Sequence, residues 1–367
     1  MRNTLLKYEH NDLNDLDFFA SHYVRKAPLY VLDEDVDQLE INSLLRYLDT
    51  VRPLANAFAL QNRNGDIVSD KAVTGTYSLE NHVDLYTKHN KLLAESDLPT
   101  SNIAVVDEVT PDGLKARRSI KFLDTAREVK NNTGTHDVIH CRTDVVNSVN
   151  QTWAFQMFGG AYRDYCENSM VFGGDKVAYQ KQKHTRHFNP HSILSTANSA
   201  LSEYERNVEA FNAWKDVKVT DKMAMEFLAE TMCKYSDKEI EKRAMELVGA
   251  DADDPYIKYN KKKLASLLVI WNEYSRYESL GKNKWALYNT LTHFATHTHE
   301  TYNIVAQDKH GINYDTEHCT GRIGKNTNAL QASNRGKNYT LTEQHDRSRN
   351  IAFVVTTPAW QGIGQVA

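Results

Sequence analysis

The stretch from Asn147 to His187 decides the fold; it reads NSVNQTWAFQMFGGAYRDYCENSMVFGGDKVAYQKQKHTRH. Trp153, Phe155 and Met157 alternate with other residues, and the segment from Val177 to Lys183 alternates in the same way. Side chains of a strand point alternately to its two faces, so a period of two predicts β-strands.

The chain on either side of this stretch completes the pattern. Ile103 to Val109 and Ala116 to Leu123 flank a Pro-Asp-Gly turn and predict a hairpin. After the stretch, Asn189-Pro190 is a helix start signal, and the apolar spacing becomes helical. Strands followed by helices predict an α+β fold, with an antiparallel β-rich N-terminal and middle part packed with a C-terminal helical section.

This organisation predicts four segments along the chain. Residues 1–187 form a mixed α/β part with an antiparallel sheet, and residues 188–306 form a helical section that packs on it. Residues 307–350 are polar, basic and poor in large apolar side chains, so we expect a long arm or loop. Residues 351–367 begin with a short β-like segment.

Local signals add detail to the first part. Ala57 to Val68 contains Asn64-Gly65 and predicts a hairpin with a tight turn. Ser78 to Glu95 has helical spacing, with Ser78 as the expected N-cap, and Leu16 to Val24 also has helical spacing. Gly159-Gly160 predicts a bulge or turn at the end of a strand.

The charge of the chain is unevenly distributed. The net charge is -4, but residues 1–110 carry 10 Lys/Arg against 18 Asp/Glu, and residues 115–187 carry 12 against 7. A basic face on an acidic protein attracts phosphates. The alternative is two solvated surfaces of opposite sign that meet in an oligomer.

Cysteine usage and hydropathy indicate the compartment. The 4 cysteines are scattered without a CxxC pair, which indicates neither a disulfide framework nor a zinc site. No window approaches the roughly 20 apolar residues of a membrane span, and the first residues lack a signal core. We therefore expect a cytoplasmic protein with no membrane partner.

Basic and aromatic residues interleave toward the end of the quoted stretch. Single-stranded nucleic acid is held by cations that contact phosphates and by rings that stack on bases. Two arginines of the earlier hairpin could extend the same surface. The candidate contacts are Arg117, Arg118, Lys176, Tyr179, Lys181, Lys183, Arg186 and Phe188. The alternative is a strand edge that lysines keep soluble.

One group of histidines has metal-ligand spacing. His293, His297 and Glu300 lie on one face of an expected helix from Lys284 to Thr301, and could hold a divalent metal. The chain has no HExxH or Asp-rich metal signature. Packed or solvated histidines are the alternative, and we predict no cofactor.

Several short elements resemble a known family. They are Asn147-Ser148, Gly160-Ala161-Tyr162-Arg163, Cys166-Glu167-Asn168-Ser169-Met170, Lys183-His184-Thr185-Arg186-His187, and the helix segment Lys284 to Thr292 with its Trp and Tyr-Asn. Their order resembles the phage/plasmid-like family known as domain of unknown function 932. The resemblance implies a phage or plasmid gene that acts in the bacterial cytoplasm, and supplies no reaction. The chain departs from the family where Val149-Asn150-Gln151 replaces the usual Tyr/His-Asp-Gly.

Three functions are compatible with these patterns. The leading one is a non-enzymatic, homo-oligomeric protein of phage DNA metabolism that binds single-stranded nucleic acid. By fold-level analogy it could be an annealing or recombination factor of the Rad52-like type. The second is a metal-dependent nuclease or hydrolase that uses the His/Glu helix face. The third is a virion or host-interaction protein that docks through its long arm and the tail at Trp360.

Overall fold

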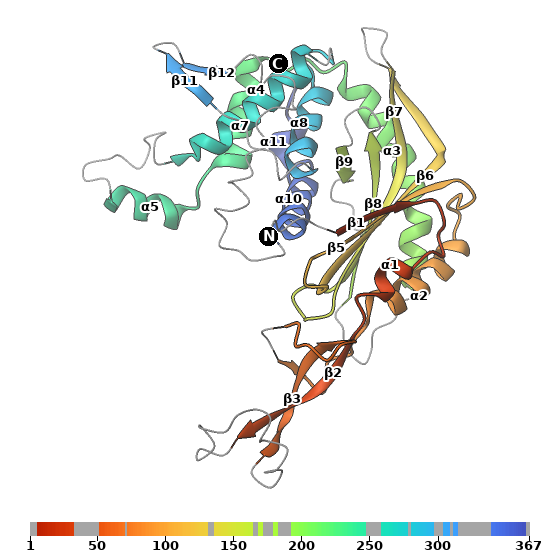
Figure 1. Cartoon of the computed structure of the whole chain (residues 1–367). Helices are drawn as coiled ribbons and strands as arrows, with labels where there is room; N and C mark the ends of the chain where they lie inside the picture. The colour runs from red at the N-terminus through yellow and green to blue at the C-terminus, as the bar shows by residue number, and fades with distance from the viewer. Residues whose placement is uncertain are drawn as a thin grey trace. The chain divides into compact units, whose positions relative to one another are not determined.

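The protein has an α+β fold, shown by a computed structural model (Figure 1). The structure describes residues 6–32, 51–69, 72–130, 136–163, 168–171, 179–182, 192–246, 258–277, 280–296, 304–308, 311–314 and 339–364. The predicted fold class is confirmed. No helix among these residues is long and apolar enough to cross a membrane.

The strands of the described residues form three antiparallel sheets. The largest has the order β1-β5-β6-β7-β8-β10, and β9 also pairs with β8; the others are β2-β3-β4 and β11-β12. The strands are β1 (Leu6–His10), β2 (Val24–Leu32), β3 (Val51–Asn62), β4 (Val73–Thr74), β5 (Ile103–Val109), β6 (Lys115–Lys130), β7 (His136–Ser148), β8 (Phe155–Arg163), β9 (Asn168–Val171), β10 (Tyr179–Gln182), β11 (Ile304–Asp308) and β12 (Gly311–Tyr314).

Most of the helices follow the main sheet in sequence. They are α1 (Asp17–Ala20), α2 (His82–Ala94), α3 (Ser192–Trp214), α4 (Asp221–Leu228), the π-helical turn η5 (Ala229–Cys233), α5 (Asp237–Glu246), α7 (Lys261–Asn272), the π-helical turn η6 (Glu273–Tyr277), α8 (Lys284–Thr296), α10 (Tyr339–Val354) and α11 (Pro358–Gln361).

The chain divides into two compact units that do not coincide with the four predicted segments. Unit 1 comprises residues 1–122, 143–158 and 177–199, and unit 2 comprises residues 123–142, 159–176 and 200–367. The long strands β6, β7 and β8 therefore contribute residues to both units.

The core of unit 1 lies between α2 and one face of the sheet. α2 buries Leu85 and Tyr86, and the Tyr86 hydroxyl donates a hydrogen bond to the carbonyl of Val145 on β7 at 3.3 Å. The ring of Phe19 on α1 lies 4.5 Å from the Tyr86 ring. The N-cap of α2 is Asn81 rather than the expected Ser78, and the Asn81 side chain accepts a hydrogen bond from the backbone of β2.

A ribbon of β2 and β3 also belongs to unit 1 (Figure 1). The predicted hairpin at Asn64-Gly65 is confirmed: Gly65 has a φ of 90°, and the amide of Val68 donates to the carbonyl of Leu60 at 2.9 Å. The expected helix over residues 16–24 is shorter, because β2 begins at Val24 and pairs with β3.

In unit 2, the buried Tyr204 of α3 contacts the parts of β6 and β7 that belong to this unit. The Tyr204 hydroxyl lies 2.9 Å from the carbonyl of Thr125 and 2.8 Å from that of Ile139. Three other α3 residues with the predicted helical spacing are also buried: Ala197, Val208 and Phe211. The predicted helix is confirmed from Ser192 onward, and the start signal at Asn189-Pro190 lies outside the described residues.

A cluster of rings closes the core of unit 2. Trp360 on α11 is fully buried, and its ring lies 5.2 Å from the Trp214 ring and 5.6 Å from the Phe227 ring. The Lys284 ammonium lies 4.9 Å from the Trp360 ring. Trp360 is therefore a core residue, and the expectation that its tail docks a partner is wrong for this side chain.

Three local predictions differ from the structure. Residues 351–354 are the end of helix α10, because Ile351, Val354 and Val355 are buried at helical spacing. Tyr339 to Asn350 therefore belongs to a helix instead of the expected arm. Gly159-Gly160 lies inside β8, where Gly160 pairs with Val171 of β9, and ends no strand.

Candidate nucleic-acid interface

The pairing of β5 with β6 sorts the predicted arginines onto opposite faces of the sheet. Val105 stands opposite Ile120 on the buried apolar face, and Glu108 stands opposite Arg117. Arg117 and Arg118 are consecutive residues of one strand, so they point to different faces. They therefore do not form one surface.

Arg118 lies in the core of unit 1, where its side chain is 0% exposed. Its Nε lies 3.3 Å from Asp107 Oδ1, and its Nη2 donates to the Asp15 carbonyl at 3.1 Å. His10 Nε2 lies 3.0 Å from Asp107 Oδ2. Burial raises the pKa of Asp107 to about 6, although the charge of Arg118 acts in the opposite direction. The prediction that Arg118 contacts phosphates conflicts with this burial, since its charge is used inside the fold.

Arg117 is also engaged with a carboxylate. Its Nε donates to Glu108 Oε2 at 2.6 Å, and its Nη2 lies 2.5 Å from the same oxygen. A cation paired in this way has a weakened attraction for an external phosphate. Arg117 therefore contributes less to the interface than the sequence predicts.

Lys181 keeps the expected position. It is exposed on β10 and stands opposite Gln156 of β8. Tyr179, two residues earlier on the same strand, stands opposite Phe158. No carboxylate among the described residues pairs with Lys181. The other predicted contacts Lys176, Lys183, Arg186 and Phe188 lie outside the described residues.

The predicted metal face is described only at His293. This side chain is buried, and its Nδ1 lies 2.9 Å from the hydroxyl of Tyr274. His297 and Glu300 lie outside the described residues. Within the described ranges, no three His, Cys, Asp or Glu side chains are grouped to hold a metal ion.

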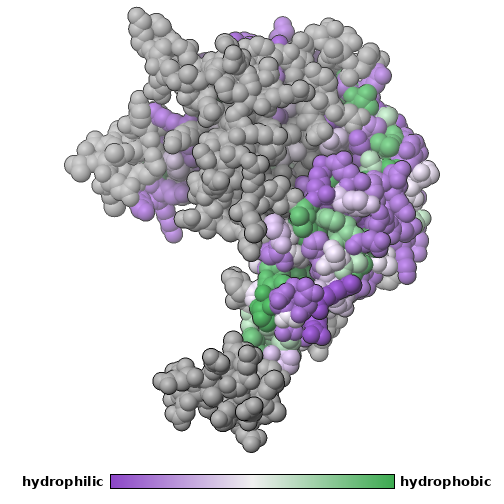
Figure 2. Space-filling model, viewed as in Figure 1, coloured by the Kyte–Doolittle hydropathy of each residue, from purple (hydrophilic) through white to green (hydrophobic). Residues whose placement is uncertain are grey.

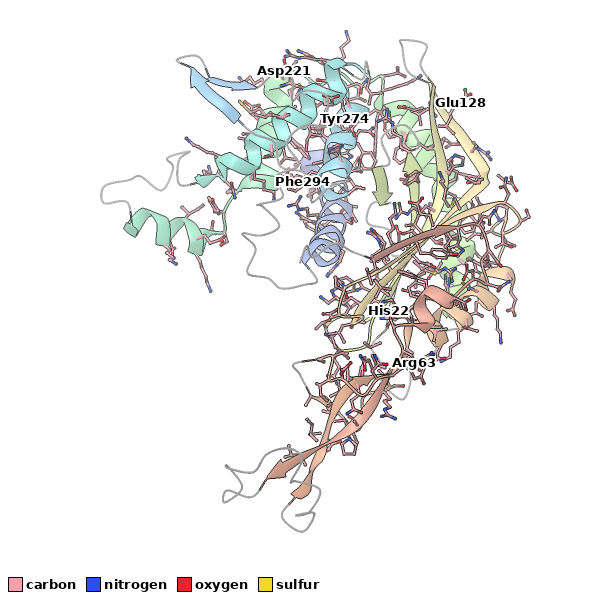
Figure 3. The ribbon with its side chains drawn as sticks, viewed as in Figure 1. His22, Arg63, Glu128, Asp221, Tyr274 and Phe294 are labelled. Carbon is pink, nitrogen blue, oxygen red and sulfur yellow. The ribbon has the colours of Figure 1, made fainter. Side chains whose placement is uncertain are left out.

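A pocket on the β2–β3 ribbon is absent from the sequence predictions. It has a volume of about 330 Å³ and is lined by Tyr23, Arg25, Gln61, Asn62 and Arg63. Figure 3 labels Arg63 at the end of the ribbon where β3 ends. The sequence did not predict this site, because the register that places Arg25 opposite Gln61 depends on pairing between segments that are distant in sequence.

Residues of the family-like elements meet inside unit 2. Arg163 Nη2 donates to Asp137 Oδ1 at 2.6 Å, and Trp285 Nε1 donates to Asp137 Oδ2 at 3.2 Å. Arg163 Nη1 also lies 3.4 Å from Asn289 Oδ1. All four side chains are buried, so they hold β7, β8 and α8 together.

The Asn-Ser element is buried as well, in unit 1. Asn147 Nδ2 donates to the carbonyl of Glu80 at 3.1 Å and lies 3.0 Å from His82 Nδ1. Ser148 Oγ donates to the carbonyl of Trp153 at 3.0 Å and accepts from its amide at 2.9 Å. These contacts hold the buried Asn-Ser element inside unit 1.

Comparison with known families gives one finding. A family model described as a domain of unknown function (DUF932) matches residues 114–350, which is more than half of the chain. Comparisons with curated proteins and with solved structures find no match.

Proposed function

The chain belongs to the DUF932 family, whose function is unknown, and we propose that it binds single-stranded nucleic acid through Lys181, Arg25 and Arg63, three exposed cations of unit 1. One observation carries the proposal. Lys181, Arg25 and Arg63 are exposed, and no carboxylate among the described residues pairs with them. The buried Arg118 of the same unit, in contrast, is held by Asp107.

The charge distribution supports this assignment. Residues 115–187 carry 12 Lys/Arg against 7 Asp/Glu, in a chain whose net charge is -4. An unpaired exposed cation can release the counterions of a phosphate when it binds, which gives affinity independent of base sequence. Arg63 also lies 5.8 Å from the ring of Tyr23, which is exposed, so a cation and a stacking surface occur together.

A salt titration tests the proposal. Fluorescence anisotropy with a labelled single strand of about 20 nucleotides is measured with the full chain from roughly 50 to 200 mM salt. We expect the logarithm of the affinity to fall linearly with the logarithm of salt, with a slope of about -0.7 for each phosphate contacted. An absence of binding to DNA and RNA strands at the lowest salt would overturn the proposal.

A matched pair of variants locates the contact on β10. Lys181→Gln removes an exposed cation of the proposed surface, and Lys91→Gln removes an exposed cation of α2 outside it. We expect Lys181→Gln to weaken binding and to reduce the magnitude of the salt slope by about 0.7, and Lys91→Gln to change neither. Equal effects of the two changes would show a general dependence on net charge.

Oligomer formation is the second part of the proposal. β1 and β10 end the strand order of the described sheet, and Leu6 and Tyr8 of β1 are exposed apolar residues. Sheet edges of this kind pair readily with a second chain. Light scattering at the concentrations used for binding checks this part; a monomer at saturation with the strand would remove it.

The finer role is annealing of complementary strands in phage DNA metabolism, in the cytoplasm of the infected cell. It is supported by the order of strands and helices together with the proposed strand binding. A strand-annealing assay with two complementary labelled oligonucleotides tests it. Strand binding without acceleration of annealing would restrict the function to binding.

A further inference from the structure

The ribbon pocket is built by the register of β2 against β3. Arg25 stands opposite Gln61, and Gln61 also forms a bridge with Ile67 beyond the turn. Residues that stand opposite one another in a sheet share a face, so a cation, an amide and an apolar side chain form a row. Arg63 lies at the end of β3 beside Tyr23, with the guanidinium carbon 5.8 Å from the ring centre.

The two faces of β2 have different roles. On the opposite face from Arg25, Lys26 Nζ donates to the carbonyl of Thr74 at 3.1 Å, to that of Gly75 at 3.3 Å and to that of Tyr77. The Lys26 ammonium is therefore used in binding β4 and the loop that follows it. Arg25 and Arg63 make no ion pair and donate no side-chain hydrogen bond to other described residues.

The pocket face is open to a ligand and is partly apolar. Tyr23 is 37% exposed and Ile67 is 56% exposed. Figure 2 shows hydrophobic residues at the surface of unit 1 near the root of the ribbon, surrounded by hydrophilic ones. Exposed rings and aliphatic groups beside two cations provide a surface on which a flat group can lie while its charge is neutralised.

These groups match the parts of a nucleotide. A guanidinium donates two parallel hydrogen bonds to a phosphate, and a tyrosine ring stacks on any base. Gln61 carries an amide that can donate to and accept from a base edge, whereas the Asn62 amide is used in the turn, where its Oδ1 accepts from the amides of Asn64 and Asp66. The pocket has no carboxylate in its lining, which disfavours a metal ion.

We infer that the Tyr23–Arg25–Arg63 pocket holds one nucleotide unit, with the phosphate between the two arginines and the base on Tyr23 and Ile67. The volume of about 330 Å³ lies at the small end of ligand pockets, which fits a single unit. This inference rests on the proposed function where the unit belongs to a bound strand. A free nucleotide has the same chemistry and is the second source.

The experiment measures binding of two probes to the full chain. One probe is a labelled single strand of about 20 nucleotides. The other is a 5′-mononucleotide, observed through quenching of tyrosine emission and by equilibrium dialysis. The variants are Arg25→Gln, Arg63→Gln and Tyr23→Leu, with Lys91→Gln as the control for lost positive charge.

We expect each arginine variant to weaken strand binding about tenfold and to lower the salt slope, because one phosphate contact is lost. Tyr23→Leu should weaken binding roughly 5- to 100-fold with an unchanged salt slope, because it removes stacking and no charge. Lys91→Gln should leave both quantities as in the wild type. Thermal unfolding of each variant verifies that the ribbon remains folded.

The outcomes separate this inference from the proposed function. If the strand binds in a salt-dependent way but the pocket variants match Lys91→Gln, the inference is wrong and the proposed function stands. If only the mononucleotide binds and Arg25→Gln abolishes its binding, the pocket stands as a site for free nucleotides and the proposed function fails. If a polyglutamate peptide competes as well as the strand, and Tyr23→Leu has no effect, the pocket is a site for acidic peptides and the inference is overturned.

Discussion

Two arginines of this protein lie beside tyrosine rings at nearly the same distance, and their surroundings are opposite. The Arg163 guanidinium lies 5.6 Å from the Tyr274 ring in unit 2, and the Arg63 guanidinium lies 5.8 Å from the Tyr23 ring in unit 1. Arg163 is 1% exposed and bonded to Asp137. Arg63 is exposed, and no described carboxylate pairs with it.

The comparison shows that surroundings decide the role of a cation–aromatic pair. A buried guanidinium must be neutralised, because removing a charge from water is costly, and its partner then fixes it in place. An exposed guanidinium keeps its donors for a ligand. The family match covers Arg163 but begins beyond Arg63, so the ribbon pocket lies outside the matched residues.

The largest effect should follow from breaking the buried pair. Asp137→Asn removes the carboxylate that accepts from Arg163 and Trp285, and leaves the guanidinium uncompensated in the core. We expect the free energy of unfolding to fall by about 3–5 kcal/mol. Urea unfolding followed by circular dichroism measures it.

Asp216→Asn is the matched control, because Asp216 is an exposed carboxylate of unit 2. It should change the free energy of unfolding by less than about 0.5 kcal/mol. If Asp137→Asn changed the free energy of unfolding as little as Asp216→Asn, the contacts of Asp137 with Arg163 and Trp285 would not stabilise the fold.

The stability of the protein should also depend on pH through His89, a buried histidine of unit 1. Burial lowers the pKa of His89 on α2 to about 4, and the charge of Arg118 lowers it further. The unfolded chain binds the proton near pH 6.5, so the stability that neutral His89 provides is present above that pH and is lost as the pH falls toward 4.

His89→Gln removes this titration. We expect wild type to lose up to about 3 kcal/mol relative to His89→Gln between pH 6.5 and 4, and the two to run parallel above pH 7. Urea unfolding at a series of pH values measures the difference. Parallel curves throughout would show that His89 titrates normally, as an exposed group does.

The smallest effect is expected at Arg117, whose exposure lies between that of the buried Arg163 and that of the exposed Arg63. Its side chain is 17% exposed and paired with Glu108. Arg117→Gln should cost roughly 1 kcal/mol of stability and weaken strand binding less than twofold, since the charge is already compensated. A loss of binding as large as that of Arg63→Gln would mean that Glu108 does not hold Arg117 away from phosphate.

Much of the fold could be predicted from local patterns. The hairpin from Ile103 to Leu123, the turn at Asn64-Gly65 and the stripe on α3 each depend on residues close together in sequence. The end of α10 could not be predicted, because the run at Ile351 fits a strand or a helix and only burial in unit 2 decides between them.

The candidate site could be predicted only in part. Lys181 follows from alternation along one strand, and its exposure agrees with the prediction. Arg118 reads as basic surface in the sequence, but its core position depends on Asp107 and Asp15, which lie in other segments. Arg25 and Arg63 are separated in sequence and become neighbours only through the β2–β3 register.

The most direct measurement is the single-strand affinity of Arg63→Gln beside that of Arg163→Lys, each with its urea midpoint, under conditions where both are folded. Lysine keeps the charge of Arg163 and loses the planar fork that contacts Asp137 and Asn289. The account predicts weaker binding with an unchanged midpoint for Arg63→Gln, and unchanged binding with a lower midpoint for Arg163→Lys. Wild-type affinity in Arg63→Gln, or weakened affinity in folded Arg163→Lys, would contradict it.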